Sequence, residues 1–156
     1  MYYQYIDSPI GILTIAEEEA QLRYLLFDRQ SLAGEESSTP LLEETKQQLR
    51  EYFRGERREF SLPLNPQGTP FQQLAWAGLQ SIPYGETISY GQLAARIGHP
   101  KSFRAVGGAN HHNPIAIMIP CHRVIGADGS LTGYGGGLEK KIFLLKLEQA
   151  EGFRKK

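Results

Sequence analysis

A four-residue segment, Asn65-Pro66-Gln67-Gly68, separates a strand-like half of the chain from a helix-like half. Three short runs before it are rich in β-branched and aromatic residues and are bounded by turn residues: Tyr2–Ile6, Ile10–Ala16 and Leu22–Phe27. Such runs predict an antiparallel meander of strands. Beyond the segment, apolar residues recur at spacings of three and four, which predicts helices. We therefore expect an α+β protein with two domains, residues 1–65 and residues 66–156.

One helix and one further strand are expected in the first domain. Residues 34–39 are polar and predict a loop. Pro40 suits the first turn of a helix, which runs to about Phe53 and is stopped by Gly55. Phe60–Leu64 has the composition of a strand. The first domain is thus expected to be a small β-sheet with a helix.

Four helices are expected in the second domain, each marked by residues that begin or end helices. The first begins at Thr69-Pro70 and is ended by Pro83-Tyr84-Gly85. The second, Tyr90–Ile97, is capped by Ser89 and followed by Gly98, and the third runs from Phe103 to about His111 with Ser102 as its cap. The last is an amphipathic helix over Leu138–Gln149. Between the last two, Ile115–Ile119 predicts a short buried strand or extended run. The six glycines within residues 126–137 predict a long loop.

Composition excludes several classes of protein. The longest clean apolar run, Ile115–Ile119, has five residues, whereas a membrane-spanning helix needs about 20. The first seven residues hold neither the basic nor the apolar region of a secretory signal. The chain has a single cysteine, Cys121, which excludes an internal disulfide and any zinc site built on two cysteines of one chain. An unpaired thiol suits a reducing compartment. We expect a cytoplasmic protein with no membrane partner, metal or cofactor.

The net charge of zero hides an asymmetry along the chain. Residues 1–89 hold seven Lys or Arg against thirteen Asp or Glu, a net charge of −6. Residues 90–156 hold ten against four, a net charge of +6. A basic half indicates an anionic partner, although chance clustering of solvated charges gives the same numbers.

The two short helices after Ser89, joined by a turn that contains a glycine, have the pattern of a helix-turn-helix. Arg104 lies in the first turn of the second helix, and four small residues remove bulk from that helix: Ala105, Gly107, Gly108 and Ala109. Small residues let a helix approach another surface closely. That surface is either a neighbouring helix of the same domain or a groove of nucleic acid.

Cys121 follows Pro120, which stiffens the backbone before the thiol. Its cationic neighbours His122 and Arg123 are expected to lower the thiol pKa and favour the thiolate. A free cysteine is also a common small, buried apolar residue. Neighbouring side chains of an extended stretch point apart, so His122 reaches the sulfur only through water or after a turn.

Glu148 lies one turn after Leu144 and Leu145, along the apolar stripe of the last helix. An acid there is either a residue of the helix edge or a partly buried partner for a cation. Oriented toward His122, it would hold the imidazole in one tautomer, as in an acid–base–nucleophile triad. We interpret the other three histidines, His99, His111 and His112, as solvated residues at helix ends. No two possible metal ligands in the sequence have the spacing of a metal site.

The segment Pro120-Cys121-His122-Arg123-Val124 resembles the O6-alkylguanine-DNA alkyltransferases, also called methylated-DNA–protein-cysteine methyltransferases. Ile88–Ala94 looks like the first helix of that family's helix-turn-helix, and Arg104–Ala109 looks like its recognition helix. Further matches follow in the family's order: Asn113-Pro114, Gly133-Tyr134, Gly136-Gly137-Leu138 and Lys141 to Glu148. The resemblance covers residues 70–150 strongly, and residues 1–65 resemble only the family's variable N-terminal domain.

This resemblance implies a DNA repair protein that alkylates itself. Cys121 would attack the alkyl carbon on guanine O6, or on thymine O4, and keep the group as a stable thioether, so each molecule would react once. His122, bridged through water to Glu148, would act as base for the thiol. Asn113 would shape the turn beneath Cys121. Zinc-binding cysteines, which some members carry in the N-terminal domain, are absent from this sequence.

The resemblance also implies how a monomer would bind double-stranded DNA that carries O6-alkylguanine. Guanine O6 cannot reach a buried thiol from inside the base stack, so the nucleotide would have to flip out. Arg104 would fill the gap, and Tyr90 would press on the target phosphate and donate a hydrogen bond to the guanine. The second helix would read the minor groove through Ala105, Gly107 and Gly108. Tyr90, Val124, Tyr134 and Gly135 would line the guanine pocket, where the family often has serine in place of Gly135.

Two functions from other classes remain open from the residues alone. A damage-binding protein without catalysis needs no reactive thiol, and relatives that only bind damage replace the cysteine that is present here. A cysteine hydrolase would use Cys121, His122 and Glu148, yet the sequence has no evident oxyanion loop. Transfer of an alkyl group to the protein excludes the first alternative, and turnover of esters or peptides would support the second.

Overall fold

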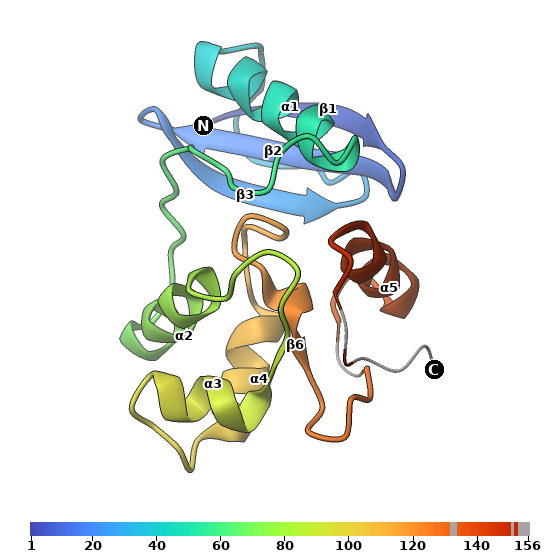
Figure 1. Ribbon diagram of the computed structural model, residues 1–156. Helices are drawn as coiled ribbons and strands as arrows, with labels where there is room; N and C mark the ends of the chain where they lie inside the picture. Colours follow the sequence, from blue (N-terminus) through green and yellow to red (C-terminus); the bar gives the residue numbers. More distant parts are fainter. Residues whose placement is uncertain (132–133, 151, 153–156) are drawn as a thin grey trace. The chain divides into compact units, whose positions relative to one another are not determined.

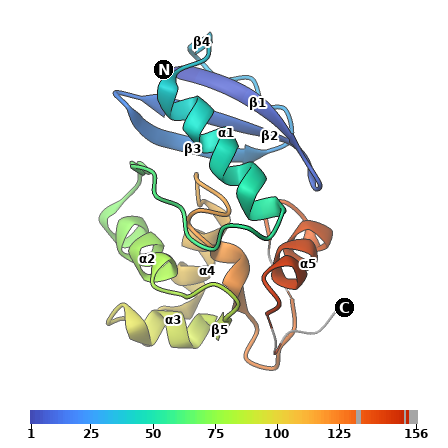
Figure 2. The same ribbon diagram turned by 45° about the horizontal axis from the view of Figure 1, so that its top comes forward.

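The computed structural model describes residues 1–131, 134–150 and 152 (Figure 1 and Figure 2). Contacts divide the chain into two compact units. Met1–Gln67 and Pro114–Ala116 form the first, and Gly68–Asn113 and Ile117–Lys156 form the second. The fold belongs to the α+β class, as predicted, with a four-stranded sheet in the first unit and most helices in the second.

The first unit is built on a sheet with the strand order β3-β2-β1-β4. The strands β1 (Tyr2–Ser8), β2 (Gly11–Glu18) and β3 (Gln21–Phe27) form the predicted antiparallel meander. The predicted loop over residues 34–39 instead contains a short strand, β4 (Glu35–Glu36), parallel to β1. Open backbone acceptors at the edge of β1 explain this pairing, because the Glu35 and Ser37 amides donate to the Met1 and Tyr3 carbonyls.

Helix α1 (Pro40–Phe53) lies over one face of this sheet (Figure 1, Figure 2). It begins where predicted, because the Thr39 hydroxyl accepts a hydrogen bond from the Leu42 amide at 3.1 Å and Pro40 needs no amide partner. The buried residues Leu42, Leu49 and Tyr52 lie seven or three positions apart and hold the helix to the sheet. Gly55, with φ +76°, follows the end of the helix.

The strand predicted over Phe60–Leu64 is wrong. Only Leu64 pairs, in an isolated bridge with Leu22. The Leu22 amide donates to the Pro63 carbonyl, and the Asn65 amide donates to the Leu22 carbonyl, both at 2.8 Å. Pro63 has no amide hydrogen, so this segment cannot continue the ladder toward Phe60.

The second unit packs α2 (Pro70–Gln80), α3 (Tyr90–Arg96) and α4 (Phe103–His111) against one another, and α5 (Leu138–Leu147) follows later in the chain (Figure 1). The parallel strands β5 (Ile88–Ser89) and β6 (Val124–Ile125) join distant segments of the unit. The Trp76 indole is 1% exposed and donates to the Ala109 carbonyl at 2.9 Å, which ties α2 to α4. The ends of α2 and α5 come two residues earlier than predicted.

The predicted helix-turn-helix is formed by α3 and α4. Ser89 caps α3 in a capping box with Gln92, and Gly98, with φ +81°, follows its end. Ser102 stands at the start of α4, but its side chain makes no capping hydrogen bond, contrary to the prediction. Its ψ of 33° departs from the extended backbone from which a cap hydroxyl reaches the first-turn amides.

Residues 115–119 are buried, as predicted, but they do not form a strand. Ile115 makes one bridge to Leu25 of the first unit, and the chain then turns through Ile117, which has the left-handed φ of +70°. A run of apolar residues specifies burial and does not distinguish a strand from a buried turn.

Candidate active site

Cys121 begins a single 3₁₀ turn, Cys121–Arg123, which leads directly into β6. The Arg123 amide donates to the Pro120 carbonyl at 3.0 Å, and Pro120 itself has φ −82° and ψ 65°. The backbone therefore turns at this point, as one of the two possibilities left open by the sequence required. Because the backbone turns here, His122 and Arg123 need not point to opposite sides of a strand as they would in an extended segment.

Asn113 connects the end of the α4 segment to this turn. Its side-chain amide donates to the Ile119 carbonyl at 2.7 Å and to Cys121 Sγ at 3.2 Å. The first bond fixes the backbone before Pro120, and the second places a donor on the sulfur. A donor on the sulfur favours the thiolate, which accepts more strongly than the thiol.

His122 and Arg123 both bind Glu148, which stands at the C-terminal cap of α5. Glu148 Oε2 lies 2.8 Å from His122 Nε2, and the Arg123 guanidinium donates to the same carboxylate from Nε at 2.8 Å and Nη2 at 3.0 Å. Arg123 Nη1 also donates to the Ile82 carbonyl. The water bridge expected between His122 and Glu148 is therefore wrong: the two side chains meet directly.

The charges of this buried group follow from its contacts. Burial raises the pKa of Glu148, but the hydrogen bonds that it accepts from His122 and Arg123, together with the Arg123 charge, outweigh burial and hold that pKa well below its ordinary value. Burial lowers the pKa of His122 despite the opposing carboxylate, so the imidazole is neutral at pH 7. An ionised Glu148 can only accept, so His122 Nε2 carries the proton and Nδ1 keeps its lone pair. Nδ1 is buried and makes no hydrogen bond with the residues that the structure describes.

The thiol of Cys121 does not have the lowered pKa expected from its sequence neighbours. Burial raises its pKa, and the Asn113 hydrogen bond and the charge of Lys141 only partly oppose this. Arg123 is engaged by Glu148 and Ile82, and His122 is neutral, so neither supplies the cation expected beside the sulfur. Cys121 is thus a thiol at neutral pH and needs a base to become a nucleophile.

Lys141 is a residue of this region that sequence reasoning left without a role. It is 1% exposed, and its ammonium donates to the Val124 carbonyl at 2.6 Å and lies 5.8 Å from the centre of the Tyr134 ring. Burial lowers the pKa of Lys141 to about 8, opposed by its interaction with Cys121. The sequence shows two adjacent lysines at the start of this helix, and nothing in it marks Lys141 rather than Lys140 as the buried one.

The candidate DNA-binding residues lie on α3 and α4. On α4, Arg104, Ala105 and Gly108 are exposed and Gly107 is half-buried, whereas Tyr90 is half-buried at the start of α3. Among the candidate pocket residues, Val124 is buried, Tyr134 half-buried and Gly135 exposed, while Gly133 of the matched Gly133-Tyr134 pair lies outside the described residues. His99, His111 and His112 are exposed, as predicted.

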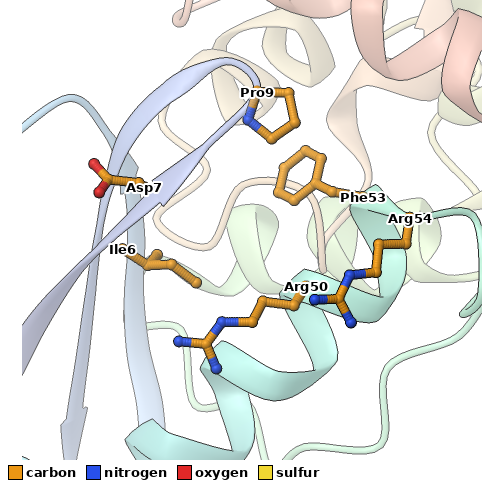
Figure 3. Close-up of a pocket in the computed structure, with 6 residues that line it drawn as sticks. All are labelled: Ile6, Asp7, Pro9, Arg50, Phe53 and Arg54. Atoms are coloured by element: carbon orange, nitrogen blue, oxygen red, sulfur yellow. The ribbon is translucent and has the colours of Figure 1, made fainter.

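A pocket of about 230 Å³ lies in the first unit, between the β1–β2 hairpin and α1 (Figure 3). It is lined by Ile6, Asp7, Pro9, Arg50, Phe53 and Arg54. It is smaller than the roughly 300–1,000 Å³ of typical small-molecule sites, and its lining holds no cysteine or histidine. Over the described residues, no three His, Cys, Asp or Glu side chains gather as a metal site would require. The chemistry therefore concentrates around Cys121.

Comparison with known proteins agrees with this geometry. The family model described as "6-O-methylguanine DNA methyltransferase, DNA binding domain" matches residues 70–150, and the one described as "6-O-methylguanine DNA methyltransferase, ribonuclease-like domain" matches residues 1–66. The constitutive methylated-DNA–protein-cysteine methyltransferase of Bacillus subtilis is 49% identical, with 95% of each chain covered. The corresponding protein of Methanosarcina acetivorans is 49% identical, over 95% of this chain and 98% of that one.

A solved structure is similar over nearly the whole chain. The crystal structure of Mycobacterium tuberculosis OGT in complex with DNA has a TM-score of 0.90 and 50% sequence identity, and covers 96% of this chain and 93% of that chain. Both halves of the sequence, the fold, and a cysteine held beside a histidine–glutamate pair thus agree with one assignment. The chain belongs to the family of O6-methylguanine DNA methyltransferases.

Proposed function

We propose that this protein is a methylated-DNA–protein-cysteine S-methyltransferase that moves an alkyl group from O6 of guanine in duplex DNA to its own Cys121. The observation that carries the proposal is the arrangement around the thiol: Asn113 donates to Cys121 Sγ, and the adjacent His122 is held by an ionised Glu148. The relatives named as methylated-DNA–protein-cysteine methyltransferases support the same reaction.

The chemistry follows from the protonation states. Neutral His122 accepts the proton of Cys121 at Nδ1 through a bridging water, because the structure shows no direct hydrogen bond between the two groups. The resulting imidazolium is stabilised by the Glu148 carboxylate. The thiolate sulfur attacks the alkyl carbon on O6, so a sulfur–carbon bond forms as the carbon–oxygen bond breaks. The electron pair remains on the guanine, which takes up, by way of water, the proton that Cys121 gave to His122, while Tyr90 donates a hydrogen bond to the leaving base. The thioether is stable, so each protein molecule acts once.

Duplex DNA is the substrate that the second unit suits. Arg104, Ala105, Gly107 and Gly108 give α4 a surface of small residues with one projecting cation, and DNA in the complex of the Mycobacterium tuberculosis relative supports this partner. The damaged nucleotide flips out to reach Cys121, and Arg104 occupies the space that it leaves. The protein acts on the minor-groove side of the duplex as a monomer.

The extruded base is held by Tyr90, Val124, Tyr134 and Gly135. Among the described residues, a Cβ added at Gly135 would meet only the His111 carbonyl, at 3.9 Å, so glycine leaves room there rather than relieving a clash with that part of the chain. This room favours acceptance of alkyl groups larger than methyl, and O4-alkylthymine is a second substrate. Residues 1–65, joined by Pro114–Ala116, and the remainder of residues 66–156 form the two domains of a cytoplasmic protein that needs no metal or cofactor.

The DNA product tests this proposal. Excess protein is incubated with a duplex that contains one O6-methylguanine, and the nucleosides are then separated and quantified. The proposal predicts that unmodified guanine replaces O6-methylguanine, one residue per protein molecule, and that the DNA backbone stays intact. Loss of the base, strand cleavage, or unchanged O6-methylguanine would contradict it. Hydrolysis of ester or peptide substrates with many turnovers would favour a cysteine hydrolase instead.

A further inference from the structure

Phe103 is an apolar side chain exposed at the start of the helix that carries Arg104. It is 51% exposed, the largest fraction among the large apolar side chains that the structure describes. The Arg104 guanidinium lies 6.0 Å from the centre of its ring. A single exposed apolar residue needs no explanation by itself, so its position beside Arg104 is what matters.

The helix surface one turn beyond these two side chains is bare. Gly107 and Gly108 stand four positions after Phe103 and Arg104, and a Cβ added at either would meet no atom of the described residues within 4 Å. Neither glycine has a left-handed φ. Glycine inside a helix is less favourable than alanine by about 0.5–1 kcal/mol, so these positions are costly without a benefit to the packing of the described chain. A molecule that approaches α4 from outside would gain from them.

We propose that Phe103 is a second wedge beside Arg104, and that its ring stacks on the base pair next to the flipped nucleotide. The inference rests on the proposed function and extends it by one residue. Extruding a nucleotide exposes the faces of the neighbouring bases, and an aromatic ring can stack on any base because every base has a π-face. Proteins that bind the minor groove insert phenylalanine between base steps in this way.

Arg104 and Phe103 contribute differently to the flipped state because one side chain is charged and the other is aromatic. Arg104 supplies a charged group, which also contacts the phosphates and lone pairs around the gap. Phe103 supplies a flat apolar surface, which replaces stacking lost on extrusion. The bare surface at Gly107 and Gly108 lets the helix backbone approach closely enough for both side chains to enter. Phe103 therefore acts on the flipped state of the DNA rather than on Cys121.

The experiment compares single-turnover rates of full-length variants on two substrates, an O6-methylguanine duplex and free O6-methylguanine base. Phe103→Ala is expected to slow the duplex reaction about 10-fold, which corresponds to loss of one aromatic–base stack, and to leave the free-base reaction unchanged. Phe103→Trp should keep the duplex rate, and Phe103→Leu should fall between. Leu74→Ala is the matched control, because Leu74 is an exposed apolar residue of α2, 40% exposed, and should change neither rate.

A fluorescence measurement reports stacking independently of the chemical step. In the non-reactive Cys121→Ala protein, 2-aminopurine placed beside the lesion is expected to fluoresce differently with Phe103 than with Phe103→Ala. Leu74→Ala should match the protein with Phe103. Circular dichroism checks that each variant is folded at the temperature of the assay.

The outcomes separate this inference from the proposed function. If the wild-type protein leaves the duplex methylated, the proposed function fails and the wedge with it. If wild type reacts and Phe103→Ala matches it on duplex, the wedge alone is wrong. Equal losses on duplex and on free base would make Phe103 a support of the fold or pocket and would also overturn the inference.

Discussion

Glu148 Oε2 lies 2.8 Å from His122 Nε2, and both side chains are fully buried. The same carboxylate is the counter-charge of the buried Arg123. Glu148 therefore has two roles. It fixes the tautomer of His122 in which Nδ1 can accept a proton, and it neutralises the buried Arg123 guanidinium. A variant at this position must affect both the rate and the stability.

Replacing Glu148 by glutamine is expected to slow single-turnover transfer about 10²–10⁴-fold, the usual contribution of a positioned base. It should also lower the free energy of unfolding by about 3–5 kcal/mol, because Arg123 loses its counter-charge. Duplex affinity should stay near that of wild type. Glu139→Gln, an exposed acid on the same helix, is the control and should change none of the three. Quenched flow measures the transfer rate, urea unfolding the stability, and anisotropy the duplex affinity. If folded Glu148→Gln transferred the methyl group at the wild-type rate, Glu148 would have only a structural role.

The buried Lys141 predicts a dependence of stability on pH. Its pKa is about 8 in the folded protein, against about 10.4 in an unfolded chain. Between these values the unfolded chain binds more protons, so the free energy of unfolding rises with pH, by up to about 1.4 kcal/mol per pH unit. Cys121, whose pKa is raised, acts in the opposite direction above pH 9, so the test uses a Cys121→Ala background.

In that background, urea unfolding at several pH values from 8 to 9.5 should show stability increasing. Adding Lys141→Met should remove the increase, and adding Lys146→Met, which removes an exposed lysine of the same helix, should keep it. The same slope in all three proteins would mean that Lys141 is not the group that titrates.

Gly108→Ala is expected to act in opposite directions on the free protein and on its complex with DNA. The new methyl group meets no atom within 4 Å in the part of the chain that the structure describes, so the substitution should stabilise the free protein by about 0.4–1 kcal/mol. In a closely packed DNA interface the same methyl group should cost about 1–3 kcal/mol of binding free energy, as overpacking does elsewhere. Urea unfolding and anisotropy measure the two effects. Stabilisation with undiminished duplex affinity would exclude this face of α4 from the interface.

Local signals explain which parts of the fold could be predicted. Thr39, Thr69 and Ser89 each cap a helix with their own side chains, and these helices begin where the sequence predicts. Such caps depend on three or four neighbouring residues, so the sequence can reveal them, although the cap predicted at Ser102 does not form. The strand expected over Phe60–Leu64 depended instead on a partner strand, and Pro63 removed the donor that pairing needs.

The chemistry of the candidate site was harder to predict because it depends on contacts between distant residues. The sequence paired Glu148 with His122 but gave no reason to expect Arg123 on the same carboxylate, which reverses the inference that Arg123 activates the thiol. The burial of Lys141 depends on how α5 is rotated about its axis, and two adjacent lysines do not reveal that. The raised pKa of Cys121 likewise follows from burial, which its neighbours in sequence do not report.

The central claim is that Cys121 itself receives the alkyl group, and intact-protein mass spectrometry tests it most directly. After incubation with excess O6-methylguanine duplex, the wild-type protein should gain the mass of one methyl group and no more, because the chain has a single thiol. Peptide mapping should place the group on Cys121, and Cys121→Ala should bind the duplex and keep its original mass. An unchanged wild-type mass while the DNA is repaired, or a methylated Cys121→Ala protein, would contradict the account.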